Sequence, residues 1–203
     1  MNKLLSALIV LTIASCNTPQ KKSTLPFLGN TIYEENDTIY HTIQDFQLVN
    51  QDSVFVSNET FANKIYVADF FFTSCPTICP TMKAQMLRVY DRFKDSSEFS
   101  ILSHTIDPKY DTVALLKDFA ERLGVESSKW HFVTGEQDYI YDLGEKSYMV
   151  MANEDPKAEG GFIHSGAFLL VDKKRRIRGA YDGTVPEQVD ALMNDIDLLL
   201  REK

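Results

Sequence analysis

The sequence predicts an α/β fold in which a central mixed sheet is flanked by helices and preceded by a β-hairpin extension. Three observations point to this class. Residues 65–72 are almost uniformly apolar, which is typical of a central strand covered on both faces. Strand-like and helix-like segments then alternate three times up to residue 146, which predicts a parallel core with right-handed crossovers. Residues 167–181 add two strands around a basic turn, which predicts an antiparallel hairpin.

The first expected element is a short hairpin at the start of the domain. Apolar residues occur at Ile43, Phe46 and 48–49, and again at 54–56 after the polar stretch 50–53. This spacing predicts two short strands joined by a polar turn. We therefore expect an N-terminal hairpin ahead of the apolar central strand.

Helical periodicity begins directly after the apolar strand. Between Pro80 and Lys94, large apolar side chains recur at intervals of three and four residues, which predicts an amphipathic helix. These side chains are Met82, Met86, Val89, Tyr90 and Phe93. Pro76 and Pro80 lie near the start of this helix, where proline is best tolerated.

The remaining segments continue the alternation. The expected elements are a strand at 99–106, a helix from about Thr112 to Gly124, a strand at 130–133, a helix from 134 to about 146, hairpin strands at 167–172 and 177–181, and a last helix at 186–201. Glycine at position 124 is a typical helix end. The whole segment 31–203 has a length suited to one domain.

The first fifteen residues have the pattern of an export signal. Lys3 supplies a positive charge, and residues 4–11 form an apolar stretch too short to span a bilayer. The stretch ends in Ile-Ala-Ser-Cys at 13–16, which resembles the lipobox of bacterial lipoproteins. Cys16 would then carry lipid, and the protein would be an extracytoplasmic, membrane-anchored lipoprotein on the periplasmic side. The alternative is an ordinary cleaved signal or a failed anchor.

Residues 16–30 are polar and contain two prolines. Such a composition cannot bury a core, so we expect a flexible tether between the membrane and the domain.

The formal net charge of the chain is -8 at pH 7. A surface this acidic argues against nucleic acid as a partner, because it offers no basic patch for phosphates. The one basic run, at 173–176, is expected to be a solvated turn, although it could contact an anionic partner.

Cys75 and Cys79 lie where the apolar strand ends and the helix begins. The backbone N–H groups and the dipole of a helix N-terminus favour the thiolate form of cysteine. A disulfide that closes so short a loop would constrain little of the unfolded chain, so the pair favours chemistry over structural bridging. Positions four apart share one helical face, with β-carbons about 5–6 Å apart, so the two sulfurs could exchange disulfides or share one soft metal ion.

His164 is the histidine best placed to complete a metal site. It lies in a glycine-rich loop immediately before the strand at 167–172, and loops at the ends of parallel strands are where such sites form. Two thiolates suit Cu(I), and an added imidazole also tolerates Cu(II). The alternative for His164 is a hydrogen-bonded loop histidine without a ligand role.

The other histidines are weaker candidates. His131 lies within an apolar strand and is expected to be structural. His104 is expected to pack in the core, with a secondary role near the site left open. His41 is expected at the surface.

Four methionines could offer thioether sulfur to Cu(I). Met82 and Met86 follow helical spacing, and Met149 and Met151 alternate as strand residues do, so all four are expected in the core.

Asp107 and Asp111 precede a predicted helix. We expect them to form the turn and cap that helix, with a contribution to a docking surface as the alternative.

Four motifs, in this order, resemble the Sco/SenC family of copper proteins. They are Phe-Thr-Ser-Cys-Pro-Thr-Ile-Cys-Pro at 72–80, Asp-Pro-Lys-Tyr-Asp-Thr at 107–112, Phe-Val-Thr-Gly at 132–135, and His164-Ser165 before the strand at 168–172. The resemblance implies a thioredoxin-like fold and one copper ion per chain, Cu(I) or Cu(II), bound by Cys75, Cys79 and His164. It also implies a copper metallochaperone that helps to assemble the binuclear copper centre of cytochrome c oxidase. The implied partners are the copper-receiving subunit of the oxidase and, in addition, another copper chaperone or a thiol reductase.

The chain departs from the family pattern at one position. Family members often carry an aspartate just before the histidine, where this chain has Ile163. The absent carboxylate would change the hydrogen bonding of His164 or the copper affinity without removing a ligand.

Three other functions use the same cysteines. A thiol–disulfide oxidoreductase would use Cys75 and Cys79 as its redox-active pair, but the spacing is Cys-x₃-Cys rather than Cys-x₂-Cys, and residues 160–166 lack the proline that such enzymes usually carry. A copper or redox sensor would be built from the same residues. A peroxidase is disfavoured, because Phe72 and Pro76 stand where it would need threonine or serine.

Overall fold

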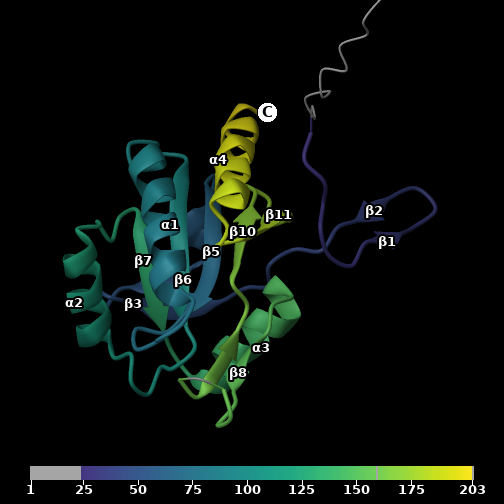
Figure 1. Ribbon diagram of the computed structural model, residues 1–203. Helices are drawn as coiled ribbons and strands as arrows, with labels where there is room; N and C mark the ends of the chain where they lie inside the picture. The colour runs from purple at the N-terminus through teal and green to yellow at the C-terminus, as the bar shows by residue number, and fades with distance from the viewer. Residues whose placement is uncertain (1–23, 159, 203) are drawn as a thin grey trace, which may run out of the picture.

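The computed structural model describes residues 24–158 and 160–202. The expected export signal and Cys16 lie outside these residues. A seven-stranded sheet in the order β11-β10-β5-β6-β7-β3-β4 forms the centre of the molecule (Figure 1). β5 (Ile65–Phe71) pairs in parallel with β6 (Phe99–Thr105), and β6 pairs in parallel with β7 (Trp130–Thr134). The predicted parallel core is therefore confirmed.

Helices follow each of these parallel strands. They are α1 (Cys79–Phe93) after β5, α2 (Val113–Leu123) after β6, and α3 (Gln137–Asp142) after β7. Helix α3 continues directly as the π-helical segment η2 (Leu143–Tyr148). The last helix is α4 (Pro186–Arg201). Gly124 ends α2 with a φ of 69°, in the left-handed region where glycine is favoured.

The sheet is buried on both faces. Ile65, Val67 and Phe71 of β5 pack into a core with the apolar sides of α1, α2 and α4. The alternate residues Tyr66 and Phe70 pack against the α3–η2 segment and the N-terminal part of the domain. This two-sided burial explains why β5 has an almost continuous apolar sequence.

Antiparallel strands complete the sheet at both edges. β10 (Ala167–Val171) pairs with β5 and with β11 (Ile177–Asp182), so the sheet is mixed, as predicted. β3 (Gln47–Asn50) pairs with β4 (Phe55–Ser57) and also with β7. The expected N-terminal hairpin is thus an edge of the central sheet. A 3₁₀ helix, η1 (Asn58–Phe61), connects it to β5.

Two small hairpins were not expected from the sequence. β1 (Ile32–Tyr33) and β2 (Thr38–Ile39) form an arm that projects from the domain, and β8 (Ala152–Glu154) pairs with β9 (Phe162–His164) below the sheet (Figure 1). Their strands of two or three residues are too short to show a hydrophobic period.

The packed part of the chain begins earlier than residue 31. Leu25 is buried, and Arg178 donates hydrogen bonds to the carbonyl of Leu25 at 2.9 Å and to that of Pro26 at 3.0 Å. The Leu28 N–H donates to the carbonyl of Ile177 at 2.8 Å. Residues 25–28, which we expected in the tether, therefore lie against the domain. Their carbonyl groups supply acceptors that the buried guanidinium of Arg178 needs.

Across the described ranges, no helix combines the length and the apolar character needed to cross a membrane.

Candidate metal centre

Cys75 and Cys79 lie just beyond the C-terminal end of β5. Cys79 is the first residue of α1, whereas Cys75 belongs to the preceding turn, where its N–H donates to the carbonyl of Phe72 at 3.2 Å. The expectation that the two cysteines share one helical face is therefore wrong in detail. The turn, rather than the helical repeat, brings Cys75 back toward Cys79.

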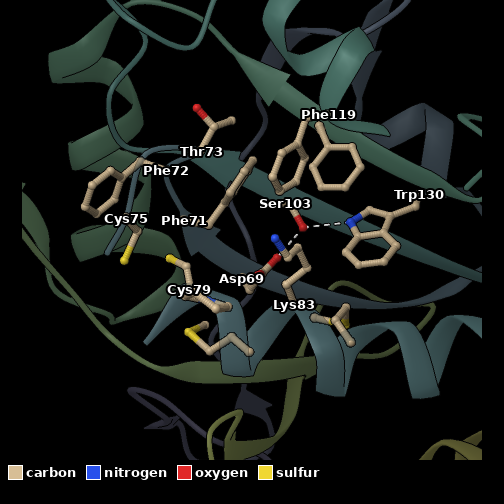
Figure 2. Close-up of a pocket in the computed structure, with 14 residues that line it drawn as sticks. Asp69, Phe71, Phe72, Thr73, Cys75, Cys79, Lys83, Ser103, Phe119 and Trp130 are labelled. Atoms are coloured by element: carbon tan, nitrogen blue, oxygen red, sulfur yellow. Dashed lines mark hydrogen bonds between the residues drawn. The ribbon is translucent and has the colours of Figure 1, made fainter. Parts of the chain in front are cut away.

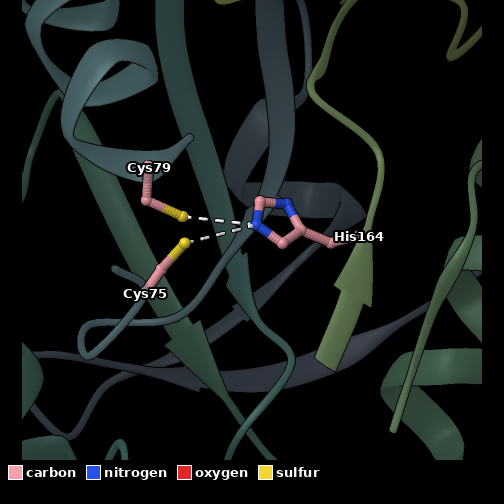
Figure 3. Close-up of side chains that lie close together, drawn as sticks. All are labelled: Cys75, Cys79 and His164. Atoms are coloured by element: carbon pink, nitrogen blue, oxygen red, sulfur yellow. Dashed lines mark hydrogen bonds between the residues drawn. The ribbon is translucent and has the colours of Figure 1, made fainter. Parts of the chain in front are cut away.

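The sulfur atoms of both cysteines face His164 Nε2 (Figure 3). Cys79 Sγ lies 3.3 Å from this nitrogen and Cys75 Sγ lies 3.8 Å from it, and the three atoms all lie within 4.8 Å of one another. Bonds of about 2.0–2.3 Å, the lengths found for zinc, would place the ligands of a planar three-coordinate ion about 3.5–4 Å apart. The arrangement therefore fits a single metal ion held by two sulfurs and one nitrogen.

His164 is carried by β9, in register with Ala152 of β8, and not by an irregular loop as expected. Its ring packs edge-on against Phe72, with centroids 5.7 Å apart. Its Nδ1 lies 3.3 Å from the carbonyl oxygen of Ser165, and since a carbonyl only accepts, Nδ1 carries the proton. Nε2 therefore presents its lone pair to the sulfurs, and the backbone carbonyl of Ser165 orients the ring.

The two thiols have different acidities. Burial tends to raise the pKa of Cys75, but hydrogen bonds from Cys79 and Thr77 outweigh burial and hold this pKa below its ordinary value. Burial raises the pKa of Cys79 well above its usual range, and neighbouring Cys75 adds to the effect. Burial also lowers the pKa of His164, so the imidazole is neutral at pH 7. Cys75 is thus the first thiol to ionise, while Cys79 stays neutral.

A cavity of about 40 Å³ lies behind the sulfur pair (Figure 2). Cys75, Cys79 and Asp69 are among its lining residues, and His164 is not. It has room for a few water molecules. Asp69 was not singled out from the sequence, although a carboxylate within an apolar strand is an observable signal.

The other histidines lie outside this cluster. His104 is fully buried, with its ring stacked on Phe70 and Nδ1 at 3.2 Å from the carbonyl of Asp69, and His131 is buried beside Asn50. Both are core residues, as predicted. His41 is half-buried rather than exposed, because one ring nitrogen lies 2.6 Å from the carbonyl of Ser147.

The four methionines divide into two pairs. Met82 and Met86 are buried, as predicted. Met149 is 42% exposed and Met151 is 61% exposed, so the expectation that they belong to the core is wrong. The alternation is real but has the opposite phase, since Val150 and Ala152 point inward.

The two aspartates of the 107–112 motif have separate roles. Asp107 accepts from the N–H of Tyr110 at 3.3 Å, as expected of a turn residue. Thr112 caps α2 by accepting from the N–H of Leu115 at 3.3 Å, so the expectation that Asp111 caps this helix is wrong. Asp111 instead points into the protein, toward the turn that carries Cys75.

The sequence and the fold have counterparts in known proteins. Residues 34–201 match the family model described as SCO1/SenC. The SCO1 protein homolog of Bacillus subtilis is 31% identical over 162 residues, which cover 79% of this chain and 83% of the relative.

Solved structures give the same result. A SCO1/SenC family lipoprotein from Bacillus anthracis superposes with a TM-score of 0.72 at 27% identity, covering 79% of this chain and 96% of that one. BsSco, described as a member of the Sco family of cytochrome c oxidase assembly proteins with a disulfide switch, superposes with a TM-score of 0.70 at 30% identity, covering 80% and 95%. The predicted thioredoxin-like α/β fold is thereby confirmed. Since the family model spans residues 34–201, this chain belongs to the SCO1/SenC family.

Proposed function

We propose that this protein is a metallochaperone that carries one copper ion, as Cu(I) or Cu(II), and passes it to a subunit of cytochrome c oxidase. The observation that carries the proposal is the convergence of Cys75, Cys79 and His164 within 4.8 Å. Thiolate sulfur selects soft ions such as Cu(I), and imidazole suits both copper states.

The coordination set favours transfer over permanent storage. Three donors leave a position open on the ion, and Thr77 and Pro76 beside Cys75 are exposed. A cysteine of the receiving protein can occupy that open position before the bonds to Cys75, Cys79 and His164 break. The ion can thus move between proteins without being released to water.

The assembly role is supported by family membership. BsSco belongs to a family of cytochrome c oxidase assembly proteins, and this chain shares its fold and 30% of its sequence. The receiving partner in our proposal is therefore the copper-receiving subunit of an oxidase. A copper donor or a thiol reductase would act before it.

The proposed location is the outer side of a bacterial membrane. A related protein from Bacillus anthracis is a lipoprotein, and residues 13–16 of this chain have the lipobox pattern. We propose an export signal at 1–15, lipid on Cys16, and a linking segment up to residue 30, of which Leu25 and Leu28 already lie against the domain.

Thiol–disulfide exchange is the second candidate function. The two cysteines are free thiols, and the lowered pKa of Cys75 beside the raised pKa of Cys79 gives one attacking and one resolving sulfur. The same pair could report metal or oxidant as a sensor.

An anaerobic titration of the reduced soluble domain, residues 21–203, with Cu(I) and with Cu(II) tests the proposal. We expect one tightly held ion, with sulfur-to-Cu(II) charge transfer that is lost in His164→Ala and weakened in Cys75→Ser and Cys79→Ser. His41→Ala, which removes a histidine outside the cluster, is the control. If the wild type binds no stoichiometric copper, the proposal is wrong and thiol–disulfide exchange becomes the preferred function.

A further inference from the structure

Asp111 is a carboxylate in an unusual position. Asp111 is 0% exposed. Its carboxylate accepts hydrogen bonds from one backbone amide and two hydroxyl groups among the described residues. The Thr73 N–H donates to Oδ2 at 3.1 Å, the Thr73 hydroxyl donates to Oδ1, and the Thr105 hydroxyl donates to Oδ2 at 2.5 Å. Burial of a carboxylate is tolerated only when such bonds replace its hydration.

These donors come from the end of the sheet that carries the sulfur pair. Thr105 is the last residue of β6, and Thr73 lies two residues beyond the end of β5 and two before Cys75. Asp111 itself lies in the connection between β6 and α2. The carboxylate therefore joins three segments at the point where the chain leaves the sheet and turns toward Cys75.

The cysteines differ in how they are fixed. Cys79 is fixed by α1, whose first residue it is. Cys75 lies in a turn whose residues Ser74, Pro76 and Thr77 are exposed, with a backbone bond from Cys75 to Phe72. The bonds from Thr73 to Asp111 anchor this turn to the rest of the protein.

We propose that Asp111 is a positioning residue for Cys75, which holds its sulfur at the separation from Cys79 and His164 that a metal ion requires. The proposal rests on the function proposed above. It assigns to the 107–112 motif a role in the geometry of the cysteine turn, although 38 positions separate Asp111 from Thr73.

A double-mutant cycle tests the proposal. Asp111→Asn removes the charge, Thr73→Val removes the hydroxyl donor, and Thr73→Ser restores it. We expect each of the first two variants to weaken copper retention against a competing chelator by about 10–100-fold, the range typical for groups that orient metal ligands. The double variant should lose little more than either single variant, and Thr73→Ser should match the wild type.

A metal-free readout separates this proposal from the proposed function. Hydrogen exchange at the Thr73 amide should accelerate in Asp111→Asn whether or not the protein binds copper. Asp107→Asn, in the same motif but with a different hydrogen-bond partner, should leave both readouts unchanged. A failure of the wild type to bind copper would contradict the metallochaperone, whereas unchanged retention in Thr73→Val, or fully additive losses, would overturn the role of Asp111. If Asp111→Asn does not fold, the comparison of Thr73→Val with Thr73→Ser decides the question.

Discussion

Ser103 donates its hydroxyl hydrogen to the carboxyl group of Asp69 across the parallel pair of strands β5 and β6. The indole N–H of Trp130 in turn donates to the Ser103 oxygen at 2.8 Å (Figure 2). Burial raises the pKa of Asp69 to about 7, and the hydrogen bond from Ser103 offsets this only in part. A carboxyl that is half-protonated at neutral pH therefore lines the cavity behind the sulfur pair.

We expect Asp69→Asn to stabilise the protein above pH 7 and to have little effect near pH 4. The pKa of Asp69 is about 7 in the folded protein, against an ordinary value of 3.8. The stability that Asp69 contributes to the fold is therefore fully present below pH 3.8 and is lost as the pH rises through about 7. The difference should reach a few kcal/mol at alkaline pH. Urea unfolding of the reduced, metal-free protein across this range measures it. Asp95→Asn, at an exposed position, should change stability by less than about 0.5 kcal/mol at any pH.

Acid should destabilise the protein through its buried histidines. Burial lowers the pKa of His104 to about 4 and that of His131 to about 4, against an ordinary 6.5. Their contribution is present above pH 6.5 and is lost as the pH falls through about 4, because only the unfolded state takes up the protons. His104→Phe should reduce the slope of the free energy of unfolding, plotted against pH, between pH 6.5 and 4. An unchanged slope between pH 6.5 and 4 would contradict a neutral buried His104.

The thiols should ionise in a fixed order. Because the pKa of Cys75 is lowered and that of Cys79 is raised, the first rise in thiolate absorbance with pH should come from Cys75. Cys75→Ser should abolish this first step, and Cys79→Ser should retain a step from Cys75. The ultraviolet absorbance of the anaerobic, metal-free protein provides the measurement. Equal first steps in the two variants would show that the thiols are equivalent.

Removal of the Arg178 side chain should be strongly destabilising. Arg178 is 2% exposed and pairs with Asp172 and Glu202, each at 3.1 Å, while Phe27 lies under its guanidinium. Arg178→Met should cost about 3–5 kcal/mol, because it leaves buried acceptors unpaired. Arg88→Met breaks an exposed pair with Asp190 and should cost no more than about 1 kcal/mol. Denaturant unfolding compares the two, and similar losses would refute the distinction.

The sequence predicted best what depends on long hydrophobic patterns. The apolar run of β5 and the helical spacing of α4 predicted the bounds of both elements almost to the residue. A strand buried on both faces is continuously apolar, whereas a helix buried on one face has apolar residues three and four positions apart. Met149 and Met151 show the limit of this reasoning. Their alternation was visible, but which phase points inward depends on the neighbouring segments, which the local pattern does not reveal.

The sequence predicted which residues form the candidate site better than it predicted which residues hold them in place. Cys75, Cys79 and His164 could be proposed together from spacing and from the family resemblance, and the structure brings them together. Their role as copper ligands stays a prediction. Asp69 escaped notice and Asp111 was expected to cap a helix, because a buried carboxylate is identified by donors distant in the chain, such as Ser103 and Thr73.

Arg178 fastens Leu25 to the pole of the domain where β5 begins, since Arg178, Ile65 and Glu202 line one depression of the surface. The sulfur pair lies beyond the other end of β5, a strand of seven residues and thus about 20 Å long. Leu25, near the start of the described residues, therefore lies on the far side of the domain from the thiols. A second large protein can approach Cys75 and His164 without steric conflict with this part of the chain.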